Sequence, residues 1–325
     1  MLARIASIRP AHFSIAVGVL AWAQLWRTAA ATVQDATALA TAMTWLGLSI
    51  WAGLSFALAA KWVLYREQLR SEVGHPGSTA LSALIPISTL LAAIALRDHA
   101  PQPARLLFLA GIVGAIILGL WVHGRYWKGE RPLETVTADM YLPAVAQNLV
   151  ASTASAAFGL DDLALLFFGA GLFSWLALES LVIVRATQHA TMPIALRPTL
   201  GIQMAPAAVG GLAYLASTQG PPDLLAKTLF GYALYQAALA LRLLPWISRH
   251  PFSPAYWSFS FGTVALATMA VLFHQRMPGS VLWESFARLL FPAANLALLT
   301  LSLLTAGLAW KRAPSRTSSP HRSHP

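Results

Sequence analysis

The chain has 325 residues, of which 57% are hydrophobic and only 10% carry a charge. Because a soluble domain carries about 25% charged residues, this composition excludes an ordinary soluble protein and favours an integral membrane protein. The absence of cysteine excludes disulfides, thiolate nucleophiles and Cys-ligated metals. The net charge of +10 is explained by membrane orientation and anionic headgroups, so we expect no nucleic-acid partner.

Ten apolar segments approach or exceed the ~20 residues that cross a bilayer as a helix. They cover 13–31, 38–64, 79–96, 104–124, 140–158, 162–184, 197–217, 223–247, 255–274 and 284–310. The sequence therefore predicts an all-α integral membrane protein over residues 1–312, with ten transmembrane helices paired as five helical hairpins. Residues 313–325 are predicted to be a disordered cytoplasmic tail, in which His321 and His324 are solvated rather than metal-bound.

The basic residues predict an orientation for these ten segments. If the N-terminus is cytoplasmic, six of the 22 Lys and Arg residues lie on the outer side: Arg27, Arg97, Arg105, Lys227, Arg276 and Arg288. The other 16 (22 − 6) lie inside, as the positive-inside rule requires. Both termini are then cytoplasmic, and the first segment is an uncleaved span rather than a secretory signal.

Three prolines, Pro86, Pro143 and Pro206, lie in every second apolar segment of this region. A proline within a helix removes a backbone hydrogen bond, which is tolerated where the helix faces protein or a water-filled cavity. The pattern predicts an inner set of kinked helices around a path, shielded by an outer set. The amides of Asn148 and Gln203, near two of these prolines, could either line the path or satisfy the freed carbonyls.

Two charged residues, Glu179 and Arg242, lie near the predicted inner ends of the sixth and eighth segments. Ionisable groups within spans are functional candidates, and Glu179 would suit a proton-coupled carrier. The similar depth of the two residues also predicts a structural role, in which their side chains either form an ion pair or extend toward the membrane interface. No GxSxG, HExxH, intramembrane aspartate pair or phosphate-cradling loop occurs in the sequence, so we expect no enzyme activity, metal or cofactor.

Nine stretches along the chain carry a further signal: HFSIAVG (12–18), HP (75–76), LIPIST (84–89), YLPAVAQN (141–148), FFGAGLFSWLALE (167–179), LGIQMAPA (200–207), LAKTLFGY (225–232), LRLLPW (241–246) and YWSFSFG (256–262). Together they resemble one known family, the tellurite-resistance/dicarboxylate transporters, which include the slow anion channels of plant guard cells. The resemblance covers nearly the whole chain. It implies ten helices with pseudo-five-fold symmetry around a central pore, in a homotrimer of the bacterial inner membrane.

The resemblance also implies roles for individual residues. Phe261, the second aromatic residue of the F-S-F-G string, matches the family's pore gate, whereas Phe259 points elsewhere; ordinary packing of Phe261 is the alternative. We expect the pore to be lined by Phe13, Ser14, Pro86, Pro143, Asn148, Pro206 and Gly262. Ser14 and Ala16 stand where the family pattern has glycine and proline, so the first span is expected to kink less.

The function that the resemblance implies is passive passage of small inorganic anions through a membrane pore gated by phenylalanine. The alternative is a secondary transporter or exporter of tellurite-type oxyanions or C4-dicarboxylates. A third class, a sensor or scaffold, has no support from the short tail. Residue chemistry alone does not explain anion selectivity, because no Lys or Arg is predicted at mid-span. Helix N-termini turned toward the pore and the basic inner mouth would both favour anions.

Overall fold

The computed structural model describes residues 5–33, 36–74, 76–129 and 131–311, and these residues form helices and turns without a β-strand. Seven of the described helices are long and apolar enough to cross a membrane. The predicted segments 13–31, 79–96 and 140–158 contain shorter α-helices. The predicted tail, with His321 and His324, lies outside the described residues, as does His75 of the HP string.

Five helices form a closed inner ring in which each helix packs against two others. In the order of contact around the ring they are α2 (Phe13–Ala29), α6 (Leu84–Leu96), α8 (Gln147–Ala157), α10 (Ala205–Ala216) and α12 (Ser258–Arg276), which returns to α2. Most of their residues are buried, including many alanines, so the backbones approach one another closely. The ring therefore forms the core of the molecule.

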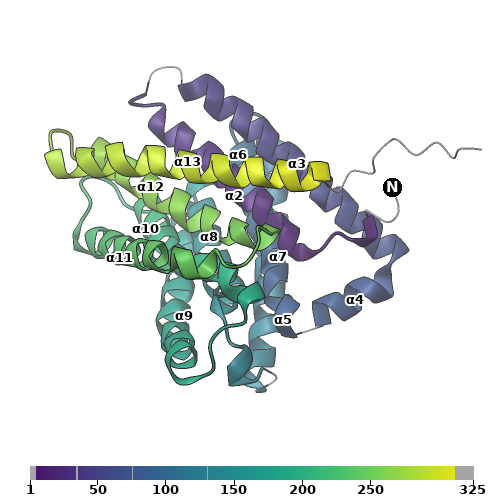
Figure 1. Ribbon diagram of the computed structural model, residues 1–325. Coiled ribbons are helices and arrows are strands. Elements are labelled where there is room, and N and C mark those ends of the chain that lie inside the picture. The colour runs from purple at the N-terminus through teal and green to yellow at the C-terminus, as the bar shows by residue number, and fades with distance from the viewer. Residues whose placement is uncertain (1–4, 34–35, 75, 130, 312–325) are drawn as a thin grey trace, which may run out of the picture.

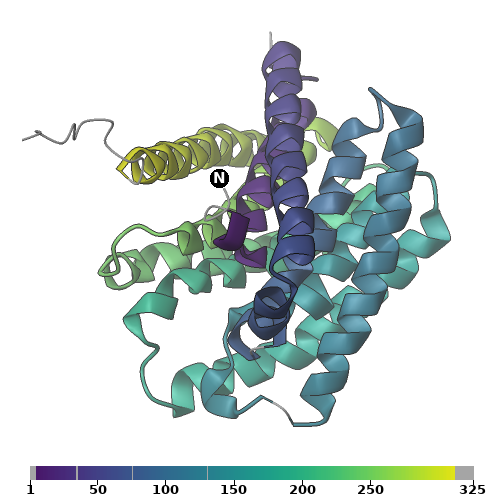
Figure 2. The same ribbon diagram turned by 90° about the vertical axis from the view of Figure 1, so that its right-hand side faces the viewer.

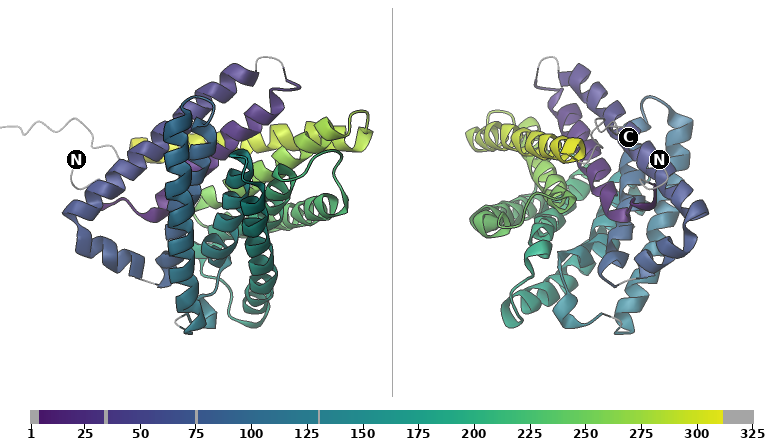
Figure 3. Two further views of the ribbon diagram at one scale, coloured as in Figure 1. Left: turned by 180° about the vertical axis from the view of Figure 1, so that it is seen from behind. Right: turned by 45° about the vertical axis from the view of Figure 1, so that its right-hand side comes forward.

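Five longer helices lie outside the ring, and each packs against the ring helix that precedes it in the chain. They are α3 (Ala36–Leu64), α7 (Pro101–Trp127), α9 (Asp161–Gln188), α11 (Leu224–Ile247) and α13 (Val281–Lys311). Figure 1 and the right-hand view of Figure 3 show these helices fanned around the centre, and in Figure 2 α3 runs upright through the middle of the view, in front of the other helices. Only 17–28% of their apolar windows is buried, against 67% for Ile194–Ala216 and Pro254–Arg276. Such exposed apolar surface is what a lipid environment requires.

Three of these helix pairs share one close contact. A glycine of the outer helix lies against a leucine of the ring helix, in the pairs Gly47–Leu20, Gly111–Leu90 and Gly171–Leu149. A Cβ atom added to any of the three glycines would lie only 2.7–2.8 Å from the leucine side chain. The repeated contact shows that these pairs pack in the same way.

Each ring helix follows a short non-α segment. These segments are the 3₁₀ helices η1 (Pro10–His12), η2 (Ala80–Ala83), η6 (Ile194–Met204) and η7 (Pro254–Trp257) and the π-helical η5 (Leu142–Ala146). Pro86 and Pro206 lie in the first turns of α6 and α10, and Pro143 lies within η5. Pro86 and Pro206 therefore lie inside the continuous helices Ala80–Leu96 and Ile194–Ala216, where a 3₁₀ stretch passes into an α-helix. A proline is tolerated there because the regular α-helical hydrogen bonds begin only after it.

The remaining described elements connect the helix pairs at the N-terminal side of the ring. They are α4 (Arg66–Gly74), α5 (Pro76–Thr79), η3 (Leu133–Thr135) and η4 (Ala138–Met140). The fully buried Lys61 of α3 donates to the Ile8 carbonyl at 2.7 Å and pairs with Glu72 of α4 at 2.7 Å. Arg131 pairs with the buried Asp139 at 2.9 Å. These pairs fix the segments that precede the ring helices.

Candidate functional site

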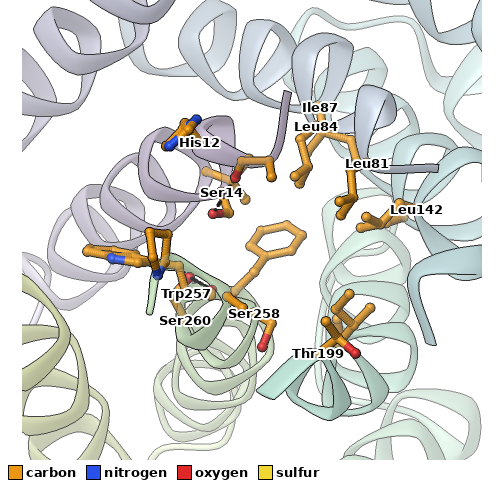
Figure 4. A pocket seen from close by; sticks show the side chains of 18 residues that line it. His12, Ser14, Leu81, Leu84, Ile87, Leu142, Thr199, Trp257, Ser258 and Ser260 are labelled. Atoms are coloured by element: carbon orange, nitrogen blue, oxygen red, sulfur yellow. Dashed lines mark hydrogen bonds between the residues drawn. The ribbon is translucent and has the colours of Figure 1, made fainter. Parts of the chain in front are cut away.

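A first cavity, here called the N-end cavity, lies beside the N-terminal ends of the ring helices. It has a volume of about 160 Å³, and every ring helix or its preceding segment contributes to the lining. Figure 4 shows Leu81, Leu84 and Ile87 on one side and Trp257 and Ser260 on the opposite side. Most of the lining is apolar, and none of its described residues is acidic.

A second cavity, the C-end cavity, lies between the same five helices toward their C-terminal ends. It has a volume of about 260 Å³ and is again lined from all five ring helices. Its lining includes the polar residues Gln24, Thr28, Thr153, Thr268 and Arg276. No described residue that lines it is acidic.

Phe261 lines both cavities, and the described linings share no other residue. It is the fourth residue of α12, and its half-buried side chain packs against the hydrophobic core. Phe259 lines neither cavity; its ring stacks on Tyr256 with 6.5 Å between the ring centroids. One aromatic side chain therefore borders both cavities inside the ring.

The predicted pore-lining residues divide into two groups. Ser14 lines the N-end cavity, and its hydroxyl donates to the Ala11 carbonyl at 2.8 Å. The others line neither cavity: Phe13, Pro86, Pro143, Asn148, Pro206 and Gly262. Phe13 is completely buried in the core. Ala16, which stands at the expected proline position, is also completely buried.

The absence of a side chain at Gly262 allows close packing and does not create open space beside the Phe261 ring. A Cβ atom added to Gly262 would lie 2.8 Å from the Met204 Cβ and 3.0 Å from the Ala205 nitrogen. The missing side chain thus lets α12 approach the junction of η6 and α10. Gly262 lines neither cavity, and its place in the pore lining stays a prediction.

The amides beside Pro143 bond to backbone carbonyls. The Asn148 amide donates to the Ala144 carbonyl at 2.6 Å, and the buried Gln147 amide donates to the Ala115 carbonyl at 2.8 Å. Of the two roles considered for Asn148, the structure therefore favours satisfaction of the backbone.

Glu179 accepts hydrogen bonds from uncharged groups and forms no ion pair with Arg242. Its Oε1 accepts from Gln203 at 3.0 Å and Tyr232 at 2.8 Å, and more weakly from Gln236. Its Oε2 accepts from Tyr141 at 2.7 Å and Trp175 at 2.8 Å. Arg242 is exposed and has no such contact, so the predicted pair was wrong.

The donors to Glu179 come from two neighbouring helix pairs. Trp175 is on α9 and Gln203 on η6, whereas Tyr232 and Gln236 are on α11. The carboxylate lines a separate lateral cavity between these elements and neither of the two cavities inside the ring. Sequence reasoning missed the partners outside α9 because they lie between 24 and 57 residues from Glu179 in the chain.

The amino-acid sequence of the chain is similar to that of known membrane proteins. A model of the SLAC1 family, described as voltage-dependent anion channels, matches residues 7–306. The chain belongs to this family. The tellurite resistance protein TehA homolog of Haemophilus influenzae is 32% identical over 302 residues, covering 91% of this chain and 90% of that protein.

Two plant proteins show lower sequence identity to the chain. The S-type anion channel SLAH4 of Arabidopsis thaliana is 25% identical over 321 residues, which cover 94% of this chain and 85% of the relative. SLAH2 of the same plant is 23% identical over 277 residues, which span about half (53%) of its length. The family and the apolar helices together identify a multi-pass membrane protein of an anion-transporting family.

Proposed function

We propose that the protein is a passive channel for small inorganic anions whose path runs through the two cavities, with Phe261 as the gate. The observation that carries this proposal is that Phe261 alone belongs to both described linings. An aromatic ring in a narrow apolar passage excludes water, and an ion cannot pass without its hydration. The ring of Phe261 would then block conduction until it moves.

The charges along the cavities support an anion rather than a cation as the permeant species. Among the described residues that line the two cavities, His12 and Arg276 have titratable side chains, and both are basic. None of the described lining residues is acidic. The ring helices also direct their N-terminal ends, which carry partial positive charge, toward the N-end cavity. A cation would meet no fixed negative side chain along this path.

The carrier reading has weaker support. A proton-coupled carrier needs a titratable group on the substrate path. Glu179, the acidic candidate, lies at the lateral cavity and is held by five donor groups. We therefore place the transport of tellurite-type oxyanions or C4-dicarboxylates second.

We further propose that all ten predicted segments cross the bilayer as five pseudo-five-fold related hairpins, with both termini cytoplasmic in a bacterial inner membrane. Two observations support this five-fold repeat: the five ring helices contact one another in a closed circle, and three helix pairs share the same glycine–leucine contact. The exposed apolar outer helices would contact lipid and, in a homotrimer, neighbouring copies. Light scattering of the purified protein in detergent tests the trimer, which requires three times the 34.8 kDa chain mass.

Planar-bilayer recording with potassium salts of chloride, nitrate and gluconate tests the channel. A channel gives discrete unitary currents whose reversal potential follows the gradient of the small anions. Flux without unitary events that follows an imposed proton gradient would instead establish the carrier.

A further inference from the structure

The C-terminal ends of the ring helices pose an electrostatic problem for an anion. The last carbonyls of a helix have no partner within the helix and carry partial negative charge. The ring helices end at Ala29, Leu96, Ala157, Ala216 and Arg276, on the side of the C-end cavity. An anion entering there would be repelled unless these carbonyls were neutralised.

Three arginines bond to those carbonyls. Arg27 donates to the Ala95 carbonyl at 3.4 Å, and Arg97 donates to the Ala157 carbonyl. Arg276 donates to the carbonyls of Leu215 at 2.8 Å and Thr218 at 3.1 Å. Cations at helix C-termini are favourable because they oppose the helix dipole.

These arginines differ in their acidic partners. Arg27 and Arg97 share Asp98, which lies between α6 and α7. Burial opposes ionisation of Asp98, but Arg97 and Arg27 outweigh it and hold the pKa of its carboxyl below the ordinary value. No carboxylate among the described residues forms an ion pair with Arg276.

Gln24, a second polar residue of the C-end cavity, carries an amide donor without a partner among the described residues. Both Gln24 and Arg276 line the C-end cavity, and the buried Gln24 Nε2 has no hydrogen-bond partner among the described residues. Gln275 donates to the Thr28 carbonyl at 2.7 Å and so holds the ends of α12 and α2 together. A buried unpaired donor is costly, and native proteins usually supply it with a partner.

The hydroxyls of the cavity are already engaged as donors. Thr28 donates to the Gln24 carbonyl at 2.9 Å, and Thr268 donates to the Val264 carbonyl at 2.8 Å. Thr153 donates in the same way to the carbonyl one turn earlier. The donors left for a ligand are therefore the Gln24 amide and the guanidinium N–H groups of Arg276 that its two carbonyl contacts do not use.

We propose that the C-end cavity is an anion-binding site in which Gln24 and Arg276 hold one small inorganic anion, such as chloride or nitrate, before it reaches Phe261. The inference rests on the proposed function, since it assigns a residence site to the permeant ion. The cavity of about 260 Å³ has room for such an anion with several waters. The ion then exchanges only part of its hydration for the two protein donors.

Conductance measured against salt concentration tests the site in a Phe261→Ala background, where the proposed gate is removed. We compare Arg276→Gln, Arg276→Lys and Gln24→Leu between 20 mM and 1 M potassium chloride. Arg276→Gln should lower conductance about fivefold at 20 mM and less than twofold at 1 M, because salt screens the lost charge. Arg276→Lys should retain most of the low-salt conductance, and Gln24→Leu should raise the half-saturating chloride concentration at least about threefold.

Arg288→Gln is the matched control, since it removes an equal charge from α13, where Arg288 is 79% exposed and pairs with Glu284. It should leave the concentration curve unchanged. Unchanged curves for both Arg276→Gln and Gln24→Leu would overturn the site. An effect of Arg288→Gln as large as that of Arg276→Gln would also overturn it, because a diffuse surface charge would then suffice.

Thermal unfolding of the purified protein with an intact Phe261 gives a readout independent of conduction. Sodium nitrate should raise the melting temperature above that in sodium gluconate at equal ionic strength, because a ligand that binds the folded state stabilises it. Gln24→Leu and Arg276→Lys should reduce this difference at least about twofold. Absence of current in Phe261→Ala would count against the channel, whereas absence of a nitrate effect in the parent protein would count against the site.

Discussion

The two cavities inside the ring differ in the groups that supply positive charge to an anion. At the N-end cavity the helix N-termini supply partial positive charge, and the described lining is largely apolar. At the C-end cavity the helix ends are negative, and Arg276 and Gln24 contribute the only charged side chain and a free amide donor among its described lining. Parallel ring helices thus favour anions through the backbone at one end and require side chains at the other.

The largest effect on anion current is expected when an acidic side chain is introduced into the N-end cavity, where the helix N-termini favour an anion. Ser14→Glu adds a carboxylate to the N-end cavity, and we expect anion current to fall at least about tenfold, since a fixed like charge is poorly screened in a narrow pore. The measurement is unitary conductance in planar bilayers. Ser14→Gln has a similar size and should lose less current; equal loss in both variants would mean that bulk rather than charge blocks the cavity.

A second test separates the ring cavities from the lateral one. Glu179→Gln weakens five contacts to the carboxylate and leaves a donor facing other donors, so we expect the free energy of unfolding to fall by roughly 2–3 kcal/mol. Thermal unfolding measures the loss, and anion permeability ratios should not change. Arg242→Gln is the control and should leave stability unchanged. A comparable loss of stability in Glu179→Gln and Arg242→Gln would instead indicate that Glu179 and Arg242 form an ion pair.

Gly262 tests how the element that holds Phe261 is packed. Gly262→Ala forces a Cβ atom to 2.8 Å from the Met204 Cβ, and overpacking of this kind costs about 1–3 kcal/mol. We expect a lower melting temperature and a shifted single-channel conductance. Gly53→Ala, where an added Cβ meets nothing within 4 Å, should show neither change. A stable Gly262→Ala protein would show that the close approach can relax freely.

The smallest expected effects are those of the prolines that precede or begin the ring helices. Pro86→Ala and Pro206→Ala should change the free energy of unfolding by less than about 1 kcal/mol, because first-turn prolines give up no internal hydrogen bond. Pro143→Ala lies in the π-helical η5 and should have the larger effect on conductance. Unitary currents of the three variants measure this order. Equal changes in all three would mean that the π-helical segment has no special influence.

Sequence reasoning reached the apolar helices and the family because both depend on composition and on local strings of residues. It also singled out Phe261, whose side chain lines both cavities and whose role as a gate stays a prediction. It failed for Glu179 because similar depth in two helices does not say which helix faces they occupy. Tyr141 directly follows η4 and Gln203 lies on η6, so the packing of η4 against η6 brings these two side chains to Glu179.

The lining residues were harder to predict than the helices. Pro86, Pro143 and Pro206 were expected in the path because they interrupt helices, but the interruption concerns the backbone and not the direction of the side chain. Arg276 was counted as a residue of the outer side, and nothing local shows that it reaches a cavity. A signal was nevertheless present, since Arg27, Arg97 and Arg276 all lie near the ends of ring helices.

The central claim is that Phe261 closes the passage between the two cavities. Voltage-clamp recording of the parent, Phe261→Ala and Phe259→Ala at matched surface expression tests it most directly. Removing the Phe261 ring should join the cavities, admit water and raise anion current at least about tenfold, since the desolvation cost of crossing falls. Phe259→Ala should leave the current near that of the parent. A Phe261→Ala protein that conducts no better than the parent, or a pore opened by Phe259→Ala instead, would contradict the account.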